Sequence, residues 1–344
     1  MIQDALQILA HGGHLDAAQA ENVMEQILSG NASDAQIGGL LVALRMNGET
    51  VEELVGFARA MRRHARPLFP SDHHPPLGVV VDTCGTGGDA KGTFNISTAA
   101  AFVVAGAGVR VAKHGNRSIS SRCGSADVLE ALGVDPEHEL ELAGRSIEEV
   151  GIGFLFAPAV HPAMRHAMRA RRELRLRTAF NLLGPLTNPA GATAQVAGVF
   201  SAQFAERVAE TLGRLGVSRA FVVHGRDGLD EISISGATFV AELADGQVHT
   251  REVTPEEFGV ARAPLETLAG GDAAHNAAII RSVLAGEPGP QRDAVLVNAA
   301  AALVAAGLAA DFREGVALAT QSIDSGASAA KLDALVRFVA PGRS

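Results

Sequence analysis

A glycine-rich loop between an apolar run and a helix start is the part of the sequence with the clearest chemistry. The stretch VVVDTCGTGGD spans Val79 to Asp89, and NIST follows at Asn95 to Thr98. Glycine lets backbone N–H groups approach an anion closely, and the N-terminus of the following helix adds partial positive charge. Asn95, Ser97 and Thr98 carry side chains able to cap that helix and to bond ligand oxygens. The pattern favours a phosphate-handling enzyme over a merely flexible turn.

A second polar segment follows the next apolar run along the chain. KHGNRSISSRCGSAD, from Lys113 to Asp127, comes directly after the run from Val109 to Ala112. Lys113 supplies a compact cation, while His114 and Asn116 supply hydrogen-bonding groups of fixed geometry. Four hydroxyls accompany them, at Ser118, Ser120, Ser121 and Ser125. Donors packed this densely after a buried strand indicate a ligand-binding loop, with a solvated surface turn as the alternative.

An acidic pair ends a third loop of this kind. HGRDGLDEIS, from His224 to Ser233, places Asp230 and Glu231 shortly after an apolar run. Hard carboxylate oxygens hold Mg²⁺ when the ion is also bound by phosphates, and water fills the remaining positions. An adjacent pair of acids is often only exposed charge. Its place after a strand, in a chain that also carries a phosphate loop, favours the metal site.

Arginines are concentrated in HPAMRHAMRARRELRLR, from His161 to Arg177. We expect one helix here, on which Arg165, Arg169 and Arg172 share one face, and Arg171 and Arg175 share another. A solvated basic surface explains most of these side chains. At least one is placed to clamp a carboxylate with two hydrogen bonds, which a guanidinium does better than an ammonium group.

Four short amphipathic helices are predicted within residues 1–66. Each of the last three has a start signal in which a capping residue is followed three positions later by Gln or Glu: Asp16 with Gln19, Ser33 with Gln36, and Thr50 with Glu53. Prolines at 67, 70, 75 and 76 then indicate an extended connector. His73 and His74, which lie between them, are expected to be solvated because no metal-ligand spacing accompanies them.

Beyond the connector, short apolar runs alternate with helical segments. Runs consistent with strands are Val79 to Val81, Val109 to Ala112, Ile152 to Phe156, Gln195 to Phe200 and Phe221 to His224. Segments consistent with helices are Thr98 to Ala107, Ala126 to Leu132 and Phe204 to Leu215. This alternation predicts an α/β layer with a mainly parallel central sheet, whose strand ends carry the chemistry. Asp245-Gly246 between Thr238 to Leu243 and Val248 to Val253 predicts a hairpin, and the chain from Ala273 onward is predicted to be mostly helical.

Composition excludes several classes of protein. The chain has 344 residues, 47% of them hydrophobic, and a net charge of −9, which opposes nonspecific attraction to nucleic acid. No apolar stretch is long enough to span a bilayer. The two cysteines, Cys84 and Cys123, lie in glycine- and serine-rich loops and indicate neither a disulfide framework nor zinc. We therefore expect a cytoplasmic enzyme.

The motifs DTCGTGGD, NIST, KHGNRSISSRCGSADVLEALGV, HPAMRHAMRARREL, FNLLGPLTNP and DGLDEIS together resemble the anthranilate phosphoribosyltransferases, in the family's order over nearly the whole chain. The resemblance implies a small helical domain, residues 1–70 with helices from about 162–190 joining it. It is hinged to a large α/β domain, residues 71–344, of the nucleoside phosphorylase/phosphoribosyltransferase type. It also implies a homodimer that uses Mg²⁺ to transfer the phosphoribosyl group of phosphoribosyl pyrophosphate to the amine of anthranilate, the second step of tryptophan biosynthesis from chorismate.

By the same resemblance, the site residues fall into three groups. Phosphoribosyl pyrophosphate is held by Gly85, Gly88, Asp89, Thr93, Asn95, Ile96, Ser97, Thr98, Lys113, His114, Gly115, Asn116, Arg117, Ser118, Ile119, Ser120, Ser121 and Ser125. Anthranilate is contacted by Gly85, Asn116 and Arg171, with His114, His161 and Pro185 lining its approach. The metal is handled by Ser97, Asp230 and Glu231. No dedicated general base is evident, so we expect positioning of the reactants plus stabilisation of the leaving group by Gly85, Gly88 and Lys113.

Two alternative functions fit parts of the sequence. A pyrimidine-type nucleoside phosphorylase also uses a glycine loop, but it lacks the paired carboxylates and the FNLLGPLTNP run argues against it; phosphorolysis of thymidine would reveal it. Proteins similar to this family bind nucleic acid instead of catalysing, but an acidic chain with a full set of site residues argues against that role. A gel-shift experiment with single-stranded and duplex DNA would reveal it.

Overall fold

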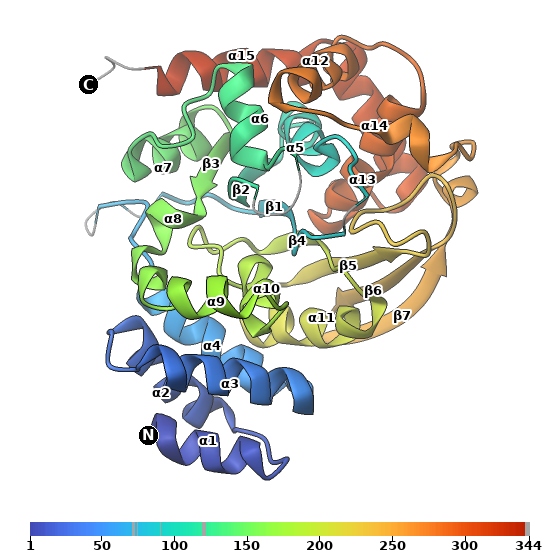
Figure 1. Ribbon diagram of the computed structural model, residues 1–344. Helices are drawn as coiled ribbons and strands as arrows, with labels where there is room; N and C mark the ends of the chain where they lie inside the picture. Colours follow the sequence, from blue (N-terminus) through green and yellow to red (C-terminus); the bar gives the residue numbers. More distant parts are fainter. Residues whose placement is uncertain (71–72, 74, 90, 119–121, 341–344) are drawn as a thin grey trace.

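One seven-stranded sheet runs through the middle of the molecule, in the order β3-β2-β1-β4-β5-β6-β7 (Figure 1). The computed structural model describes residues 1–70, 73, 75–89, 91–118 and 122–340. The strands are β1 (Val80–Gly85), β2 (Arg110–Gly115), β3 (Ile152–Phe156), β4 (Ala194–Gly198), β5 (Arg219–Gly225), β6 (Thr238–Ala244) and β7 (Gln247–Val253). The first five pair in parallel, and β6 and β7 add an antiparallel hairpin. The mainly parallel sheet predicted from the sequence is confirmed.

The four N-terminal helices are confirmed together with their start signals. They are α1 (Ile2–Ala10), α2 (Ala17–Leu28), α3 (Asp34–Asn47) and α4 (Val51–Arg63). At the starts of α2, α3 and α4 the capping side chain accepts from the backbone N–H three residues on, and Gln or Glu bonds back. These reciprocal bonds satisfy backbone N–H groups in the first turn of each helix, which have no acceptor within the helix. Local sequence alone therefore sets where these helices begin.

One face of the sheet is covered by helices that follow the strands. These are α5 (Ile96–Gly106), α6 (Ser125–Leu132), α12 (Ala273–Leu284), α13 (Pro290–Ala305), α14 (Phe312–Asp324) and α15 (Ala327–Val339). Their apolar side chains form one core with Val81, Val111 and Phe221. α13 is buried along almost its whole length because its alanines let neighbouring helices approach closely. Short turns lead into these helices: η4 (Pro255–Phe258) and η5 (Leu265–Leu268).

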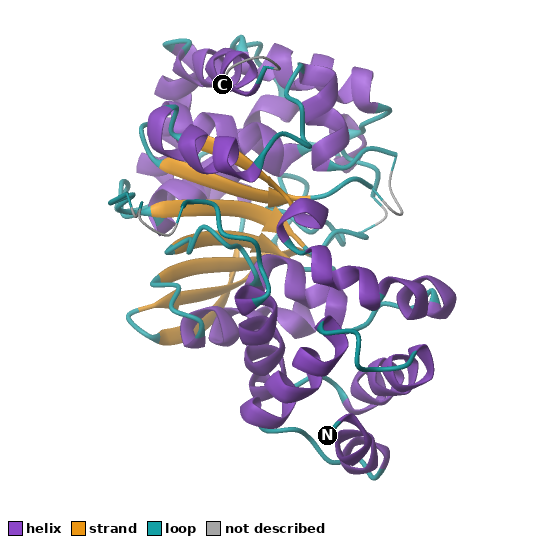
Figure 2. Ribbon diagram, turned by 90° about the vertical axis from the view of Figure 1, so that its left-hand side faces the viewer, coloured by secondary structure: helices purple, strands orange, loops and turns teal. Residues whose placement is uncertain are grey.

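The opposite face of the sheet shares its core with the N-terminal helices. α10 (Ala179–Leu183), η2 (Gly184–Leu186), η3 (Ala202–Phe204) and α11 (Ala205–Arg214) contribute to this core. Figure 2 shows helices on both sides of the sheet, with the N-terminus among the lower group. Leu54 and Phe57 of α4 belong to the same apolar cluster as Leu212 of α11 and Val222 of β5. A smaller cluster beside β2 and β3 includes α7 (Leu140–Glu149). The helical bundle is thus packed against the sheet layer through continuous apolar contacts.

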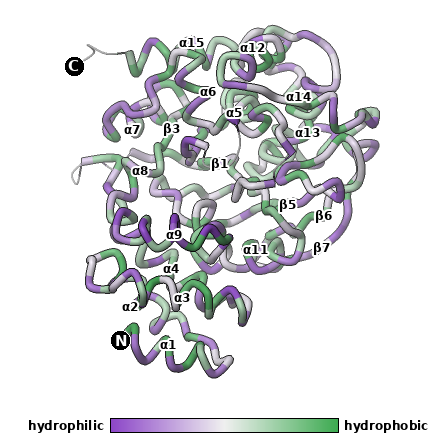
Figure 3. Tube along the Cα trace, in the orientation of Figure 1, coloured by the Kyte–Doolittle hydropathy of each residue, from purple (hydrophilic) through white to green (hydrophobic). Residues whose placement is uncertain are grey.

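The arginine-rich segment is not one helix, and that prediction was wrong. α8 (Ala157–Val160) is followed by the 3₁₀ turn η1 (Pro162–His166) and then by the short helix α9 (Met168–Leu174), which Figure 3 shows as hydrophilic. Pro162 suits a first helical position, and the tight 3₁₀ turn changes the period before α9 begins. Arg175 adopts the left-handed conformation, with φ +49°, and ends α9. The faces predicted for a continuous helix therefore do not exist.

One of the two connector histidines that were predicted to be solvated can be described. His73 is about half exposed, pairs with Glu148 at 3.0 Å and packs edge-on against Phe69, while His74 lies outside the described residues. Within the part of the chain that the structure describes, no helix is both long and apolar enough to cross a membrane.

Candidate active site

The glycine loop and the acidic pair meet at one edge of the sheet. Parallel pairing places the carboxyl ends of β1 and β4 side by side, with Gly85 opposite Gly198. A Cβ added at Gly85 would lie 3.0 Å from Oδ2 of Asp230. Two loops far apart in the sequence therefore face the same space, as the sequence-based site requires.

Gly198, which sequence reasoning did not single out, makes this approach possible. A Cβ at Gly198 would lie 1.6 Å from the backbone oxygen of Asp230, well inside any real contact distance. The carbonyl of Gly198 accepts from the backbone N–H of Thr86 at 2.8 Å. Gly198 thus joins the glycine loop to the acidic pair through its backbone. The only sequence signal was a glycine ending an apolar strand, which often marks close backbone approach.

Glu231 is tied to the first turn of α5. Its Oε1 accepts from the backbone N–H of Ser97 at 3.1 Å. The Ser97 hydroxyl oxygen accepts from Nζ of Lys113 at 3.3 Å, and the Ser97 carbonyl accepts from Oγ1 of Thr83 at 3.1 Å. Lys113 also donates to the carbonyl of Thr83 at 2.5 Å. Ser97 therefore connects all three predicted loops, and Lys113 lies beneath them rather than in solvent.

The carboxylates of this edge lack full compensation for their charge. Burial raises the pKa of Asp230 well above its usual value, and the nearby Asp89 and Glu231 raise it further. Burial also raises the pKa of Glu231 to about 7, against the opposing effect of Lys113. No arginine or lysine forms a salt bridge with either acid among the described residues. A divalent cation would supply the missing positive charge, so this donor set fits Mg²⁺.

The protein supplies two carboxylates here rather than a closed cage. No group of three or more His, Cys, Asp or Glu side chains in the described part of the chain is arranged to hold a metal. Mg²⁺ commonly binds through one or two carboxylates, with substrate phosphates and water completing its octahedron. The pair Asp230 and Glu231 matches that mode and leaves positions for a diphosphate.

A buried polar network that sequence reasoning missed positions His114. Asp82, fully buried in β1, accepts from the backbone N–H of His114 at 3.1 Å and from Nδ2 of Asn188 at 2.9 Å. Asn188 also donates to the carbonyl of Ala112 at 2.8 Å. Burial raises the pKa of Asp82, while His114, Asn188 and Lys113 oppose that shift. The network locks the end of β2 against the FNLLGPLTNP segment.

The two predicted histidines lie together beside that segment. The rings of His114 and His161 are 5.3 Å apart and nearly perpendicular. Nδ1 of His114 is 3.1 Å from the carbonyl of Gly184, and Nε2 of His161 is 3.1 Å from that of Thr187. Burial, and then the charge of His114, lower the pKa of His161 to about 3. Burial also lowers the pKa of His114, and both buried rings lie beside the turn that contains Pro185, each with one ring nitrogen that has no hydrogen-bond partner among the described residues.

Arg171, on α9, has no acidic partner in the described ranges. Its guanidinium lies 5.1 Å from the ring centroid of Phe180 on α10, and burial lowers its pKa. Its only hydrogen bond among these residues is a long contact to the sulfur of Met168. None joins it to the histidine pair. The contact with Phe180 nevertheless ties Arg171 to the helix that leads directly to Gly184 and Pro185.

Several predicted ligand residues also take part in the scaffold. Asn95 precedes α5 but its side chain does not cap the helix. It donates to the carbonyl of Cys123 at 3.2 Å and accepts from Asn276 at 2.9 Å, so the predicted capping role is wrong. The side chains of Ile96 and Thr98 are almost fully buried, which leaves their backbone for a ligand. Thr93 forms an isolated bridge with Ala269.

The loop after β2 is folded upon itself. The hydroxyl of Ser125 bonds both the N–H and the carbonyl of Asn116, at 3.2 and 3.3 Å, and it fills the space beside Gly115. Arg117 extends to three carboxylates, those of Asp127, Glu130 and Glu137. The N–H of Ser118 donates to Asp127. Ile119, Ser120 and Ser121, predicted to hold the same ligand, lie outside the described residues.

Arg177 is a further residue that sequence reasoning did not assign. Its Nη2 donates to the carbonyl of Gly88, and its guanidinium lies 4.6 Å from the ring centroid of Phe200. Its own carbonyl accepts from Nη1 of Arg45 on α3 at 2.5 Å. Gly88 has φ +80°, a conformation that favours glycine. Arg177 thus links the glycine loop to the N-terminal helices.

Known proteins share both parts of this architecture. The helical bundle domain of the glycosyl transferase family matches residues 3–65, and the a/b domain of that family matches residues 77–329. A protein of Solibacter usitatus named anthranilate phosphoribosyltransferase is 59% identical over 335 residues, covering 97% of this chain and 98% of its own. The crystal structure of the anthranilate phosphoribosyltransferase from Thermus thermophilus has a TM-score of 0.91 and 50% identity, covering 98% of this chain and 99% of that chain. The enzyme of the same name from Saccharomyces cerevisiae, in complex with PRPP and Mg, has a TM-score of 0.87 and 28% identity, covering 98% and 97%.

Proposed function

Because the chain belongs to the anthranilate phosphoribosyltransferases, we propose that its glycine loop and acidic pair hold phosphoribosyl pyrophosphate at the carboxyl edge of the sheet. The enzyme transfers the phosphoribosyl group of this substrate to the amine of anthranilate, giving N-(5-phosphoribosyl)anthranilate and pyrophosphate. This is the second step of tryptophan biosynthesis from chorismate. The observation that carries the site is the close approach of the two loops: a Cβ added at Gly85 would lie only 3.0 Å from Oδ2 of Asp230, so the glycine loop and the acidic pair face the same space.

The leaving pyrophosphate gains negative charge as the bond to the ribose breaks. Backbone N–H groups around Gly85 and Gly88 and the partial charge at the start of α5 are the chain's stabilising groups for that charge. Lys113 contributes from beneath through its contacts with Thr83 and Ser97. Asp230 and Glu231, with Ser97, would hold Mg²⁺, the enzyme's cofactor. When bound, the ion neutralises charge on the pyrophosphate oxygens.

Anthranilate is an aromatic acid with a weakly basic amine. We assign its carboxylate to Arg171, which is half-buried beside Phe180 and has no acidic partner in the described part of the chain. Gly85 and Asn116 contact anthranilate as well in this proposal, and His114, His161 and Pro185 line its approach. His161 stays neutral at physiological pH, since its pKa is about 3. No group is assigned as general base, and the rate comes from orientation and from stabilising the leaving group.

Phosphoribosyl pyrophosphate also contacts, in this proposal, the backbone of the loop after β2 and of the first turn of α5. We further propose that residues 1–70, with helices from about 162–190, act as a small domain against residues 71–344. The contacts of α9 with α3 and of α10 with α4 support that grouping. A homodimer in the cytoplasm completes the proposal, and light scattering after size exclusion measures the assembly.

Loss of anthranilate fluorescence gives the direct test. Purified enzyme with phosphoribosyl pyrophosphate and Mg²⁺ is expected to consume anthranilate, and chelation of the metal should abolish turnover. Consumption that requires no phosphoribosyl pyrophosphate, or that is indifferent to the metal, would overturn the proposal. Phosphorolysis of thymidine serves as the negative control for a nucleoside phosphorylase.

A further inference from the structure

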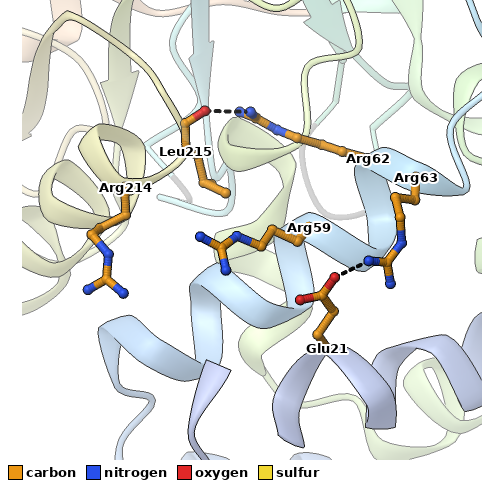
Figure 4. Close-up of a pocket in the computed structure, with 6 residues that line it drawn as sticks. All are labelled: Glu21, Arg59, Arg62, Arg63, Arg214 and Leu215. Carbon is orange, nitrogen blue, oxygen red and sulfur yellow. Dashed lines mark hydrogen bonds and ion pairs between the residues drawn. The ribbon is translucent and has the colours of Figure 1, made fainter. Parts of the chain in front are cut away.

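A hollow lined by arginines lies outside the proposed active site, where α4 meets the end of α11. Its volume is about 300 Å³, and its lining is Glu21, Arg59, Arg62, Arg63, Arg214 and Leu215 (Figure 4). Four arginines and Glu21 line it, and Glu52 and Glu25 pair with Arg214 and Arg63, so the cluster holds four positive and three negative charges in a chain whose net charge is −9. Guanidinium groups gathered this way repel one another, and an anion placed among them would relieve that repulsion.

The arginines of α4 share one face of the helix. Positions 59, 62 and 63 are three and four residues apart, so their side chains point to the same side. Arg62 and Arg63 lie in the last turn, where cations complement the helix dipole. Arg59 lies before that turn, so the dipole does not account for it. The hollow is therefore built from more positive charge than the helix end requires.

Hydrogen bonds fix most of the lining and leave one arginine available. Arg62 donates from Nε to the carbonyl of Leu186 and from Nη1 to that of Leu215, both at 2.9 Å. Arg214 pairs with Glu52 through two bonds, at 2.9 and 3.2 Å. Arg59 has no hydrogen bond or ion pair within the described ranges. In Figure 4 its guanidinium lies in the middle of the view, and no dashed line reaches it.

Arg63 is held by acids that an anion would compete with. It pairs with Glu21 and, at 3.3 Å, with Glu25, and its side chain is more than half exposed. Exposed ion pairs contribute little to stability, so Arg63 can turn toward a ligand. Arg62 cannot turn in this way, because two carbonyls hold it and burial lowers its pKa.

We propose that this hollow binds a small phosphate-type oxyanion, held mainly by Arg59 and Arg63 between α4 and the Arg214–Leu215 end of α11. A tetrahedral oxyanion accepts hydrogen bonds from several directions, which suits two guanidinium groups of α4 that lie beside the end of α11. A single planar carboxylate is satisfied by one guanidinium fork. Because α4 belongs to the N-terminal bundle and α11 packs on the sheet, the bound anion joins these two parts of the molecule.

Calorimetric titration with inorganic phosphate tests the site in Mg²⁺-free buffer at constant ionic strength. The wild type is compared with Arg59→Ala/Arg63→Ala and with the control Arg251→Ala/Arg262→Ala. The control removes two exposed, ion-paired arginines elsewhere and changes the net charge equally. All three proteins keep the glycine loop, so any phosphate that binds there contributes equally to each titration. The pocket variant is expected to lose one binding component, or to weaken it at least about tenfold, while the control keeps it.

Amide hydrogen exchange locates the same event. Phosphate should slow exchange in peptides covering the end of α4 and residues 212–218 of the wild type, and not in the pocket variant. A single variant, Arg59→Glu, keeps Arg63 and its ion pairs and therefore tests the site even if the double variant fails to fold. In this variant too, phosphate should no longer slow amide exchange in these peptides. An unchanged isotherm in the pocket variant, or equal losses in the control, would overturn the proposal.

Discussion

The backbone N–H of Ser97 donates a 3.1 Å hydrogen bond to Oε1 of Glu231. Ser97 is the second residue of α5, so this bond places an acidic side chain at the positive end of a helix. The same helix start faces the phosphate loop. This hydrogen bond holds the helix start that we propose for binding the diphosphate next to the carboxylate that we propose for binding Mg²⁺.

Removing both acids should cost most of the turnover. For Asp230→Asn with Glu231→Gln we expect a fall in kcat of about 10²–10³, because the leaving group loses its metal-bound compensation. The fold should survive, since both pKa values are raised and the neutral side chains are better suited to burial. Activity assays at saturating Mg²⁺ decide the point. Unchanged turnover there would contradict the metal assignment.

Mg²⁺ binding should release protons at mildly acidic pH. With a folded-state pKa of about 7 against an ordinary value of 4.5, Glu231 is largely protonated at pH 6, and metal binding must displace that proton. Metal affinity therefore rises from about pH 6 to about pH 8. In the metal-free protein, the contribution of Glu231 to stability is present below pH 4.5 and is lost as pH rises through about 7. Calorimetry in buffers of different ionisation enthalpy measures the number of protons released when Mg²⁺ binds. The Glu231→Gln variant should release fewer protons than the wild type.

Gly198→Ala should displace the acidic pair. The new Cβ would collide with the Asp230 backbone at 1.6 Å, so strand and loop must separate. We expect a loss of about 1–3 kcal/mol of unfolding free energy and weaker Mg²⁺ binding. Gly236→Ala is the matched control, because nothing lies within 4 Å of its Cβ and its φ is not positive. Equal effects of the two substitutions on metal affinity would argue against the close approach.

Arg177→Ala should loosen the glycine loop. The variant loses the bond to the Gly88 carbonyl and the contact with Phe200. We expect the KM for phosphoribosyl pyrophosphate to rise about tenfold while the KM for anthranilate changes little. Arg172→Ala, at an exposed position on the same segment, provides the comparison. Should the two variants share one set of kinetic constants, Arg177 has no part in positioning the loop.

Arg171→Ala should act on the other substrate. Loss of a charge-assisted bond to a carboxylate raises the KM for anthranilate by about tenfold or more and spares phosphoribosyl pyrophosphate. Arg165→Ala, an exposed arginine of η1, is the control. Steady-state kinetics with each substrate varied in turn give the answer, and the reverse pattern would place Arg171 with the diphosphate instead.

The fold was predictable because its signals are local. Reciprocal caps set the starts of α2, α3 and α4, and alternating apolar runs marked the strands, with Asp245 and Gly246 at the predicted hairpin turn. The arginine-rich segment was mispredicted because helical spacing does not reveal a 3₁₀ turn or a left-handed residue such as Arg175.

The site was predictable only as a set of residue types. Asp82 and Asn188 lie 106 positions apart, and their bond depends on the way β1 passes the FNLLGPLTNP segment. Gly198 looked like any strand glycine until the Asp230 backbone was seen to pass over it. Arg177 bonds a main-chain carbonyl, for which no sequence pattern exists. Such contacts follow from tertiary packing, which single-sequence spacing does not encode.

The apolar cluster shared by Leu54, Phe57, Leu212 and Val222 constrains how the substrates are brought together. These side chains join the N-terminal bundle to the sheet directly, so swinging the two apart would expose several hundred Å² of apolar surface, at a cost on the order of 10 kcal/mol. Small sliding displacements between α4 and α11, with side chains changing rotamer, keep that surface covered. We therefore expect any relative movement of the bundle and the sheet layer to be a small shear between packed helices, which a bulky substitution along this cluster would impede.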